Sequence, residues 1–153
     1  MHSRVHSDRQ FGYHFKRKEC AMTIRTSIDE VIESSFKRSI HASDAERAGF
    51  LLETLGPRIT AVGMGLRDVR PVKSWAADEA RPRGKDGEER LRILFRIADV
   101  VTAVEGPRVA ASFVRGANPE LDDKSVLSVL SAGAPDDALE RRLMGVVRDF
   151  LAS

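Results

Sequence analysis

The sequence predicts an all-α protein: a helical bundle that contains a helix-turn-helix, with a small C-terminal helical module after it. From Ser27 onward, apolar residues recur three or four positions apart, which is the period of one helix face. No segment alternates between apolar and polar residues as a half-buried strand would. Helix boundaries are also marked, by Ser43 with Glu46 and by the pairs Gly56-Pro57 and Gly106-Pro107.

Length and composition are those of a folded chain with one domain, or two small ones packed together. Of the 153 residues, 42% are hydrophobic and 31% are charged, which argues against wholesale disorder. No apolar run reaches the roughly 18 residues that cross a bilayer, and the N-terminus lacks the apolar stretch of a secretory signal. The single cysteine, Cys20, excludes an internal disulfide. We therefore expect a cytoplasmic protein with no membrane partner.

The charges divide the chain into parts. Residues 1–22 hold five Lys/Arg against two Asp/Glu, and residues 57–85 hold seven against three. Residues 86–153 hold nine against twelve and are therefore acidic. We expect a flexible basic arm at 1–22, N-terminal helices with a DNA-binding helix-turn-helix at 23–85, and a partner-binding helical module at 86–153.

Residues 1–22 show no sustained period, so we interpret them as a disordered extension. An arm that touches DNA is the alternative. Met22 stands just before the first periodic segment, and translation begins either at Met1 or at Met22, which the intact mass of the natively expressed protein would decide. Ser27 with Glu30 is a capping-box pair and predicts the start of the first helix.

The remaining elements follow in order. Ser43 opens a helix that Gly56 ends, and Pro57 suits the first position of the next. Two short helices are predicted at Ile59–Met64 and Val69–Ala77, followed by a charged loop or hinge at Glu79–Gly87. Next comes an amphipathic helix, Glu88–Glu105, whose apolar side holds Leu91, Leu94, Phe95, Ala98, Val101 and Val104. The last predicted segments are a helix from Pro107 to Gly116, a turn at Asn118-Pro119, a helix at Val126–Leu130 and a helix from Pro135.

The stretch Gly56–Trp75 has the composition of a helix-turn-helix. In that motif one helix braces a second, which lies in the major groove of DNA. Ala61 is the candidate small residue at the crossing, Gly65 forms the turn, and Asp68 is the candidate N-cap of the second helix. Val72, Trp75 and Ala76 would face inward at helical spacing.

The outward face of the second helix carries the candidate DNA-binding residues. Arg70, Lys73 and Ser74 lie on that face, and Arg67 lies at the turn. Arginine and lysine contact phosphates or guanine edges, and serine is a permissive partner. From Gly65 to Val72 is seven residues, one more than in the tightest form of the motif. A plain helical hairpin with solvated arginines is the alternative.

Three strings occur in an order that is similar to a known family. They are RPVKSWAADEARP at 70–82, ERLRILFRIADVV at 89–101, and NPEL at 118–121 followed by VLSVL at 126–130. Over residues 44–152 the chain resembles the Xre–MbcA–ParS antitoxin family, whose members carry a degenerate Xre-type helix-turn-helix before a small toxin-binding module. Asp78 stands where the family usually has glycine, and Val126 replaces a common proline.

The resemblance implies specific roles. The helix around Val72–Trp75 would be the recognition helix. The C-terminal helices would bind a RES-domain toxin, an NAD-consuming enzyme, and block its active site. By this resemblance the partner-binding residues are Asn118, Pro119, Leu121 and Leu127.

No residue pattern predicts an enzyme, a metal site or a cofactor. His41 precedes a helix cap and is expected to be solvated. The pairs Asp122-Asp123 and Asp136-Asp137 fall at turns or helix starts, where carboxylates favour the positive end of the helix dipole. Gly63-Met-Gly65 lacks the Lys-Ser/Thr of a phosphate loop.

The sequence therefore predicts a regulator of transcription that binds double-stranded DNA as a homodimer, is antitoxin-like, and neutralises a RES-domain toxin. We expect a homodimer because helix-turn-helix dimers bind the two half-sites of an operator. The alternative is a helical protein–protein interaction module or adaptor that does not bind DNA. Steep salt dependence of binding would identify the first, and shallow dependence the second. The operator, the partner and the oligomeric state are left open.

Overall fold

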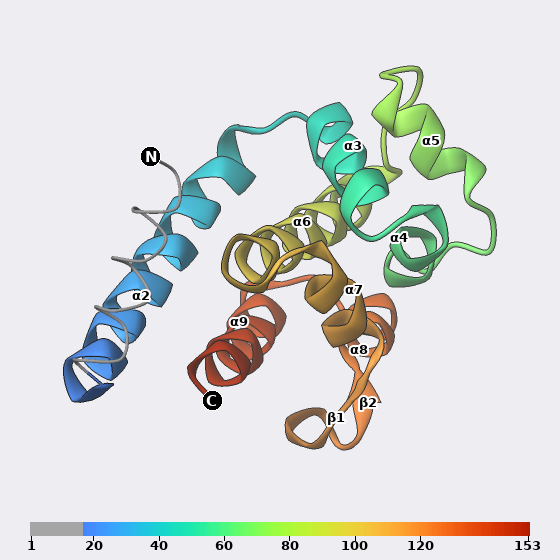
Figure 1. Cartoon of the computed structure of the whole chain (residues 1–153). Helices are drawn as coiled ribbons and strands as arrows, with labels where there is room; N and C mark the ends of the chain where they lie inside the picture. Colours follow the sequence, from blue (N-terminus) through green and yellow to red (C-terminus); the bar gives the residue numbers. More distant parts are fainter. Residues whose placement is uncertain (1–16) are drawn as a thin grey trace.

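The computed structural model describes residues 17–153, which form eight α-helices and one small hairpin (Figure 1). The all-α prediction is confirmed. The helices are α2 (Arg17–His41), α3 (Asp44–Thr54), α4 (Pro57–Gly63), α5 (Arg70–Ala76), α6 (Gly84–Glu105), α7 (Pro107–Arg115), α8 (Val126–Ala132) and α9 (Asp137–Ala152). None of these described helices is both long and apolar enough to cross a membrane.

A two-stranded antiparallel hairpin separates α7 from α8. Strand β1 (Ala117–Asn118) pairs with β2 (Lys124–Ser125), and the short 3-10 helix η1 (Pro119–Leu121) lies between them. The sequence analysis expected only a turn at Asn118-Pro119. Strands of two residues are too short to show an alternating pattern, so they could not be found in the sequence.

Helix α6 is the central element of the fold. From Leu91 to Thr102 every residue is buried or half-buried, because α2, α3, α7, α8 and α9 all pack against this helix. The predicted apolar side is buried except for Val104, which is exposed. Ile93, Ile97 and Val100 are fully buried as well. The middle of α6 is therefore covered on more sides than the predicted apolar side alone.

The structure corrects three boundaries. Helix α2 begins at Arg17, so residues 17–22 are helical and do not belong to a flexible arm. The arm at residues 1–16 lies outside the described residues. Ser27 lies inside α2, so the capping box predicted there with Glu30 is wrong. Helix α6 begins at Gly84, so the predicted loop Glu79–Gly87 ends before residue 84.

The corner between α2 and α3 was predicted well. Ser43 is the N-cap of α3: its hydroxyl accepts a hydrogen bond from the Glu46 amide, and the Glu46 carboxylate accepts one from the Ser43 amide, both at 3.1 Å. The Arg47 guanidinium adds an ion pair to Asp44 at 2.9 Å and donates to the Ser39 carbonyl at the end of α2. This corner therefore fixes the angle at which α3 leaves α2.

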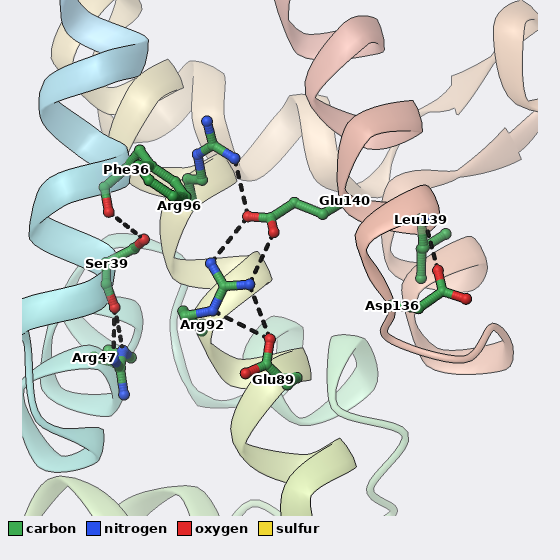
Figure 2. Close-up of polar contacts among 9 residues, drawn as sticks. All are labelled: Phe36, Ser39, Arg47, Glu89, Arg92, Arg96, Asp136, Leu139 and Glu140. Atoms are coloured by element: carbon green, nitrogen blue, oxygen red, sulfur yellow. Dashed lines mark hydrogen bonds and ion pairs between the residues drawn. The ribbon is translucent and has the colours of Figure 1, made fainter.

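A cluster of charged side chains joins α6 to α9 (Figure 2). Glu140 of α9 is 6% exposed and accepts from Arg92 at 2.8 and 3.0 Å and from Arg96 at 2.9 Å. Arg92 also pairs with Glu89 at 2.9 Å, and Arg96 lies 4.8 Å from the centre of the Phe36 ring of α2. Burial alone would raise the pKa of Glu140, but the two guanidiniums outweigh burial and lower it. The carboxylate is therefore the shared counter-ion of two half-buried arginines.

We predict that Glu140→Gln will lower the free energy of unfolding by about 3 kcal/mol, because it removes the carboxylate that two half-buried guanidiniums share and leaves Arg92 with Glu89 alone and Arg96 without a counter-ion. Urea denaturation followed by circular dichroism measures the change. Glu53→Gln, at an exposed position of α3, is the matched control and is expected to change little. An equal loss of unfolding free energy in Glu140→Gln and Glu53→Gln would contradict the prediction.

The difference in unfolding free energy between the wild-type chain and Glu140→Gln should also depend on pH. The pKa of Glu140 is lower in the folded chain than in the unfolded chain, so its stabilisation is complete above the ordinary glutamate pKa of about 4.3. It is lost as the pH falls through the folded-state pKa. The gap in stability between the wild-type chain and Glu140→Gln should therefore be narrower in acid than at neutral pH.

Candidate nucleic-acid interface

The predicted pair of short helices is present. Helix α4 covers Pro57–Gly63 and α5 covers Arg70–Ala76, with the turn between them at residues 64–69. Helix α5 packs mainly against α3, whereas α4 packs mainly against α8. The expectation that α4 braces α5 is therefore only partly correct, because α3 gives the larger support. In Figure 1, α5 lies at the outer edge of the molecule beside α3.

The turn after α4 is closed by Gly65. Its amide donates to the Val62 carbonyl at 3.0 Å, and the Leu66 amide donates to the Ala61 carbonyl at 2.8 Å, which is the Schellman pattern. This pattern places Gly65 at φ 72°, in the left-handed region that favours glycine. The prediction of a glycine turn at this position is confirmed.

Helix α5 ends in the same way. The Asp78 amide donates to the Trp75 carbonyl at 3.0 Å, and the Glu79 amide donates to the Ser74 carbonyl at 2.9 Å. Asp78 takes the place of the glycine and adopts φ 59°. A residue with a Cβ is strained in this region, although aspartate tolerates it better than most. The end of α5 therefore has backbone strain at Asp78, whereas the end of α4 has a glycine that adopts the same conformation without strain.

Two apolar side chains hold α5 in place. Val72 is fully buried and Trp75 is 6% exposed, as predicted, while Ala76 is half-buried. The N-cap position is Val69, not Asp68 as predicted. The Asp68 carboxylate nevertheless accepts a hydrogen bond from the Arg70 amide at 3.0 Å, so it satisfies one of the free amides at the start of the helix.

The four predicted DNA-binding residues lie on or beside α5. Arg67, Arg70 and Lys73 are exposed, and Ser74 is half-buried. Arg70 is not free: its Nε donates to Asp68 at 2.6 Å, although 86% of its side chain is exposed. Hydrogen bonds from Arg70 lower the pKa of Asp68, so this carboxylate stays charged next to the basic surface. The pairing of Asp68 with Arg70 was not predicted from the sequence.

A hollow of about 760 Å³ opens beside α5 and was not predicted. It lies between α5, the loop at residues 77–83 and the first turns of α6. Its lining includes Arg70, Ser74 and Trp75 of α5 and Arg81 and Arg83 of the loop. The hollow therefore adjoins the candidate DNA-binding face, and both share Arg70 and Ser74.

The four predicted partner-binding residues divide into two pairs. Leu121 is fully buried, and Leu127 is 4% exposed and packs against Gly63, so both belong to the core of this chain and neither is available to a partner here. Asn118 is half-buried, and its side chain accepts a hydrogen bond from the Glu120 amide at 2.9 Å. Pro119 is exposed, and with Asn118 it lines a second hollow of about 500 Å³.

The carboxylates that could suggest catalysis have local structural roles. The side chain of Asp136 accepts a hydrogen bond from the Leu139 amide at 2.9 Å and caps α9. Asp122 and Asp123 form the tight turn before β2 at φ 55° and 62°. His41 is exposed and is the last residue of α2, not part of a loop. In the described part of the chain, no group of three or more His, Cys, Asp or Glu is arranged to hold a metal ion.

No family model, no curated protein and no solved structure matches this chain.

We predict that Asp78→Gly will raise the free energy of unfolding by about 1 kcal/mol, because glycine adopts the left-handed conformation without steric cost. Thermal or urea unfolding measures the effect. Asp78→Ala is the matched comparison, since it removes the carboxylate but keeps the Cβ. The same unfolding midpoint for the glycine and alanine variants would show that position 78 is not strained.

Proposed function

We propose that this protein is a DNA-binding transcriptional regulator of the antitoxin type that acts in the cytoplasm as a homodimer. The observation that carries the proposal is the exposed face of α5. Arg70 and Lys73 are exposed on that face and Arg67 is exposed in the turn before it, while Val72 and Trp75 pack against the bundle on the other side. A rigid, basic, peripheral helix is what entry into the major groove requires.

Local charge supports the same assignment. The segment from Pro57 to Lys85 carries seven Lys/Arg against three Asp/Glu, and α5 with its flanking loops lies in the middle of it. Phosphate contacts from such a segment supply most of the affinity for DNA regardless of sequence. Base-edge contacts would then come from Arg70, Lys73 and Ser74, which lie on the successive turns of α5.

The length of α5 limits how it reads DNA. Seven residues span about 10 Å along the helix axis, so one copy contacts only a few base pairs. Two copies related by a two-fold axis would place their α5 helices in successive major grooves, about 34 Å apart. A palindromic operator with half-sites one helical turn apart is the expected target.

The C-terminal part supports a protein partner. The second hollow is lined by Phe113, Phe150, Asn118 and Pro119, and Phe150 is 36% exposed. Acidic residues lie beside it: the pKa of Glu120 is raised because it shares a hydrogen bond with the Asp149 carboxyl. The lining also holds one cation, Arg108, so this hollow suits a protein surface with apolar side chains and charges of both signs. On the resemblance to antitoxins, we propose a RES-domain toxin as that partner.

A module that binds only protein is the second candidate function. The pairing of Asp68 with Arg70 favours it, because the carboxylate reduces the positive potential at the start of α5. Salt dependence separates the candidates: phosphate contacts give a steep fall of affinity with salt, and an apolar interface a shallow one.

We predict that Arg70→Ala with Lys73→Ala will weaken binding to the promoter upstream of the chain's own gene. It should also reduce the slope of log affinity against log salt by about two, one for each lost phosphate contact. Fluorescence anisotropy with labelled duplex at several salt concentrations gives both values.

The matched control is Arg141→Ala with Arg142→Ala, which removes the same charge from an exposed part of α9. The control should leave the salt slope close to that of the wild-type chain. Both double variants should unfold like the wild-type chain, because none of the four side chains is buried. Equal affinity for the wild-type chain and the α5 variant would overturn the proposal.

We further predict that Asp68→Asn will strengthen DNA binding severalfold at low salt. The amide oxygen of asparagine can still accept the Arg70 N–H that starts α5, but the negative charge that holds the guanidinium is gone. The same titration measures the gain, which should shrink as salt rises. Weaker binding by this variant would mean that the ion pair positions Arg70 for DNA instead of competing with it.

A further inference from the structure

We propose that the 760 Å³ hollow between α5, the loop at residues 77–83 and α6 binds a small organic anion that carries an aromatic ring, such as an aromatic carboxylate. The volume lies within the range of about 300–1,000 Å³ that is typical of small-molecule sites. The hollow shares Arg70 and Ser74 with the proposed DNA-binding face, but the residues argued below to hold the ligand, Trp75, Arg81 and Arg83, are not among the proposed base contacts.

Part of the lining of the hollow is apolar. Met64, Leu66, Pro71 and Trp75 line it, and Trp75 is the only aromatic side chain in the lining. Trp75 and Met64 are each 6% exposed, so only a small part of each side chain remains uncovered. An aromatic ring in the hollow would cover that remainder and contact the indole, which is a favourable partner for another ring.

The lining as a whole is positively charged. It contains four arginines against the two carboxylates of Asp68 and Asp86, which leaves an excess of two positive charges. Arg90 donates to the carbonyls of Leu130 and Gly133, both at 3.0 Å, and so serves the fold. Arg70 is held by Asp68. Arg81 and Arg83, both exposed on the loop, are therefore the cations that a ligand carboxylate would meet first.

The wall that carries these two arginines is held against α6. Pro82, between them, is buried, and a Cβ built on Gly87 of α6 would lie only 3.1 Å from the Pro82 Cβ. The glycine thus allows the loop to pack closely on the first turns of α6. A site with one fixed wall loses less conformational freedom on binding than a mobile loop would.

Charge and apolarity together define the ligand class. An inorganic anion would leave the apolar part uncovered, and a neutral aromatic compound would leave the arginines without a partner. A DNA strand is too wide to place its phosphates on the apolar part of the lining while its bases stay paired. An aromatic ring with one carboxylate satisfies both parts of the lining.

The proposal is tested by equilibrium dialysis of the full chain against 2-naphthoate. Saturable binding of one molecule per chain is expected. The neutral analogue 2-naphthalenemethanol should bind about tenfold more weakly, since the charge contribution is lost. Inorganic phosphate, which has the charge but no ring, should not displace naphthoate at equal concentration. No saturable binding, or equal binding of the neutral analogue, would overturn the proposal.

Two further measurements locate the site. Trp75 is the chain's single tryptophan, so its indole N–H gives one assignable peak in a ¹⁵N-correlated NMR spectrum, and naphthoate should shift that peak. Arg81→Gln with Arg83→Gln should weaken naphthoate binding about tenfold, whereas Arg141→Gln with Arg142→Gln should not. Binding that leaves the indole peak unmoved, or that is equal in the two double variants, would place the ligand elsewhere and contradict the assignment. DNA is absent from all of these measurements, so their outcome is separate from that of the DNA-binding proposal.

Discussion

The enclosure of the middle of α6, from Leu91 to Thr102, is the constraint on which the other elements depend. Its residues from Leu91 to Thr102 touch helices on every side, so each neighbour is placed by the part of α6 that it covers. The charged residues within this stretch are paired, because a buried charge without a partner is costly, although the Arg96 Nε and the Thr102 hydroxyl are buried without a hydrogen-bond partner. Glu140 of α9 pairs with Arg92 and Arg96, and Arg38 of α2 pairs with Asp99 at 2.8 Å. These pairs allow α2 and α9 to close over what would otherwise be the solvent face of α6.

The position of α5 follows from this arrangement. The surface of α6 is occupied by five other helices, so α5 packs on the outside of α3 and is carried by Val72 and Trp75. The loop that returns from α5 to α6 crosses the space between them and leaves the hollow beside Trp75. The basic helix face and the hollow therefore have one structural origin, which is the placement of a seven-residue helix outside the central bundle. The acidic residues near Glu120 lie on the distant module formed by the hairpin and the end of α9.

Local signals in the sequence predicted local structure well. The capping box at Ser43, the glycine turn at Gly65 and the inward positions Val72 and Trp75 each depend on a few neighbouring residues, and each was found. The features that were missed or misassigned depend on contacts between residues that are far apart in the sequence. The pairing of Arg92 and Arg96 was not predicted, because their partner, Glu140, is more than forty positions away. Leu121 and Leu127 were assigned to a partner on the basis of a motif, but hairpin packing and the approach of α4 to α8 bury them. The residues that line the hollow all lie within positions 64–90, but the hollow exists only once α5 and the loop after it fold back against the start of α6. No periodicity or motif in that stretch indicates it.

Asp68 shows how stability and binding compete within α5. An isolated helix of seven residues is only marginally stable, so the start of α5 gains from a carboxylate that accepts the Arg70 amide and lies near the positive end of the helix dipole. The same carboxylate holds the Arg70 guanidinium and lowers the positive potential that would attract a phosphate. A cap without charge, such as asparagine, would preserve the first effect and remove the second. Under the proposed DNA-binding function, aspartate at position 68 would limit non-specific attraction to DNA, because Arg70 would have to exchange its intramolecular partner for each contact. A phosphate or base that meets Arg70 in good geometry can outcompete the exposed carboxylate, whereas a poorly placed one cannot. Under the same proposal, the ion pair between Asp68 and Arg70 would favour selective DNA contacts over strong ones.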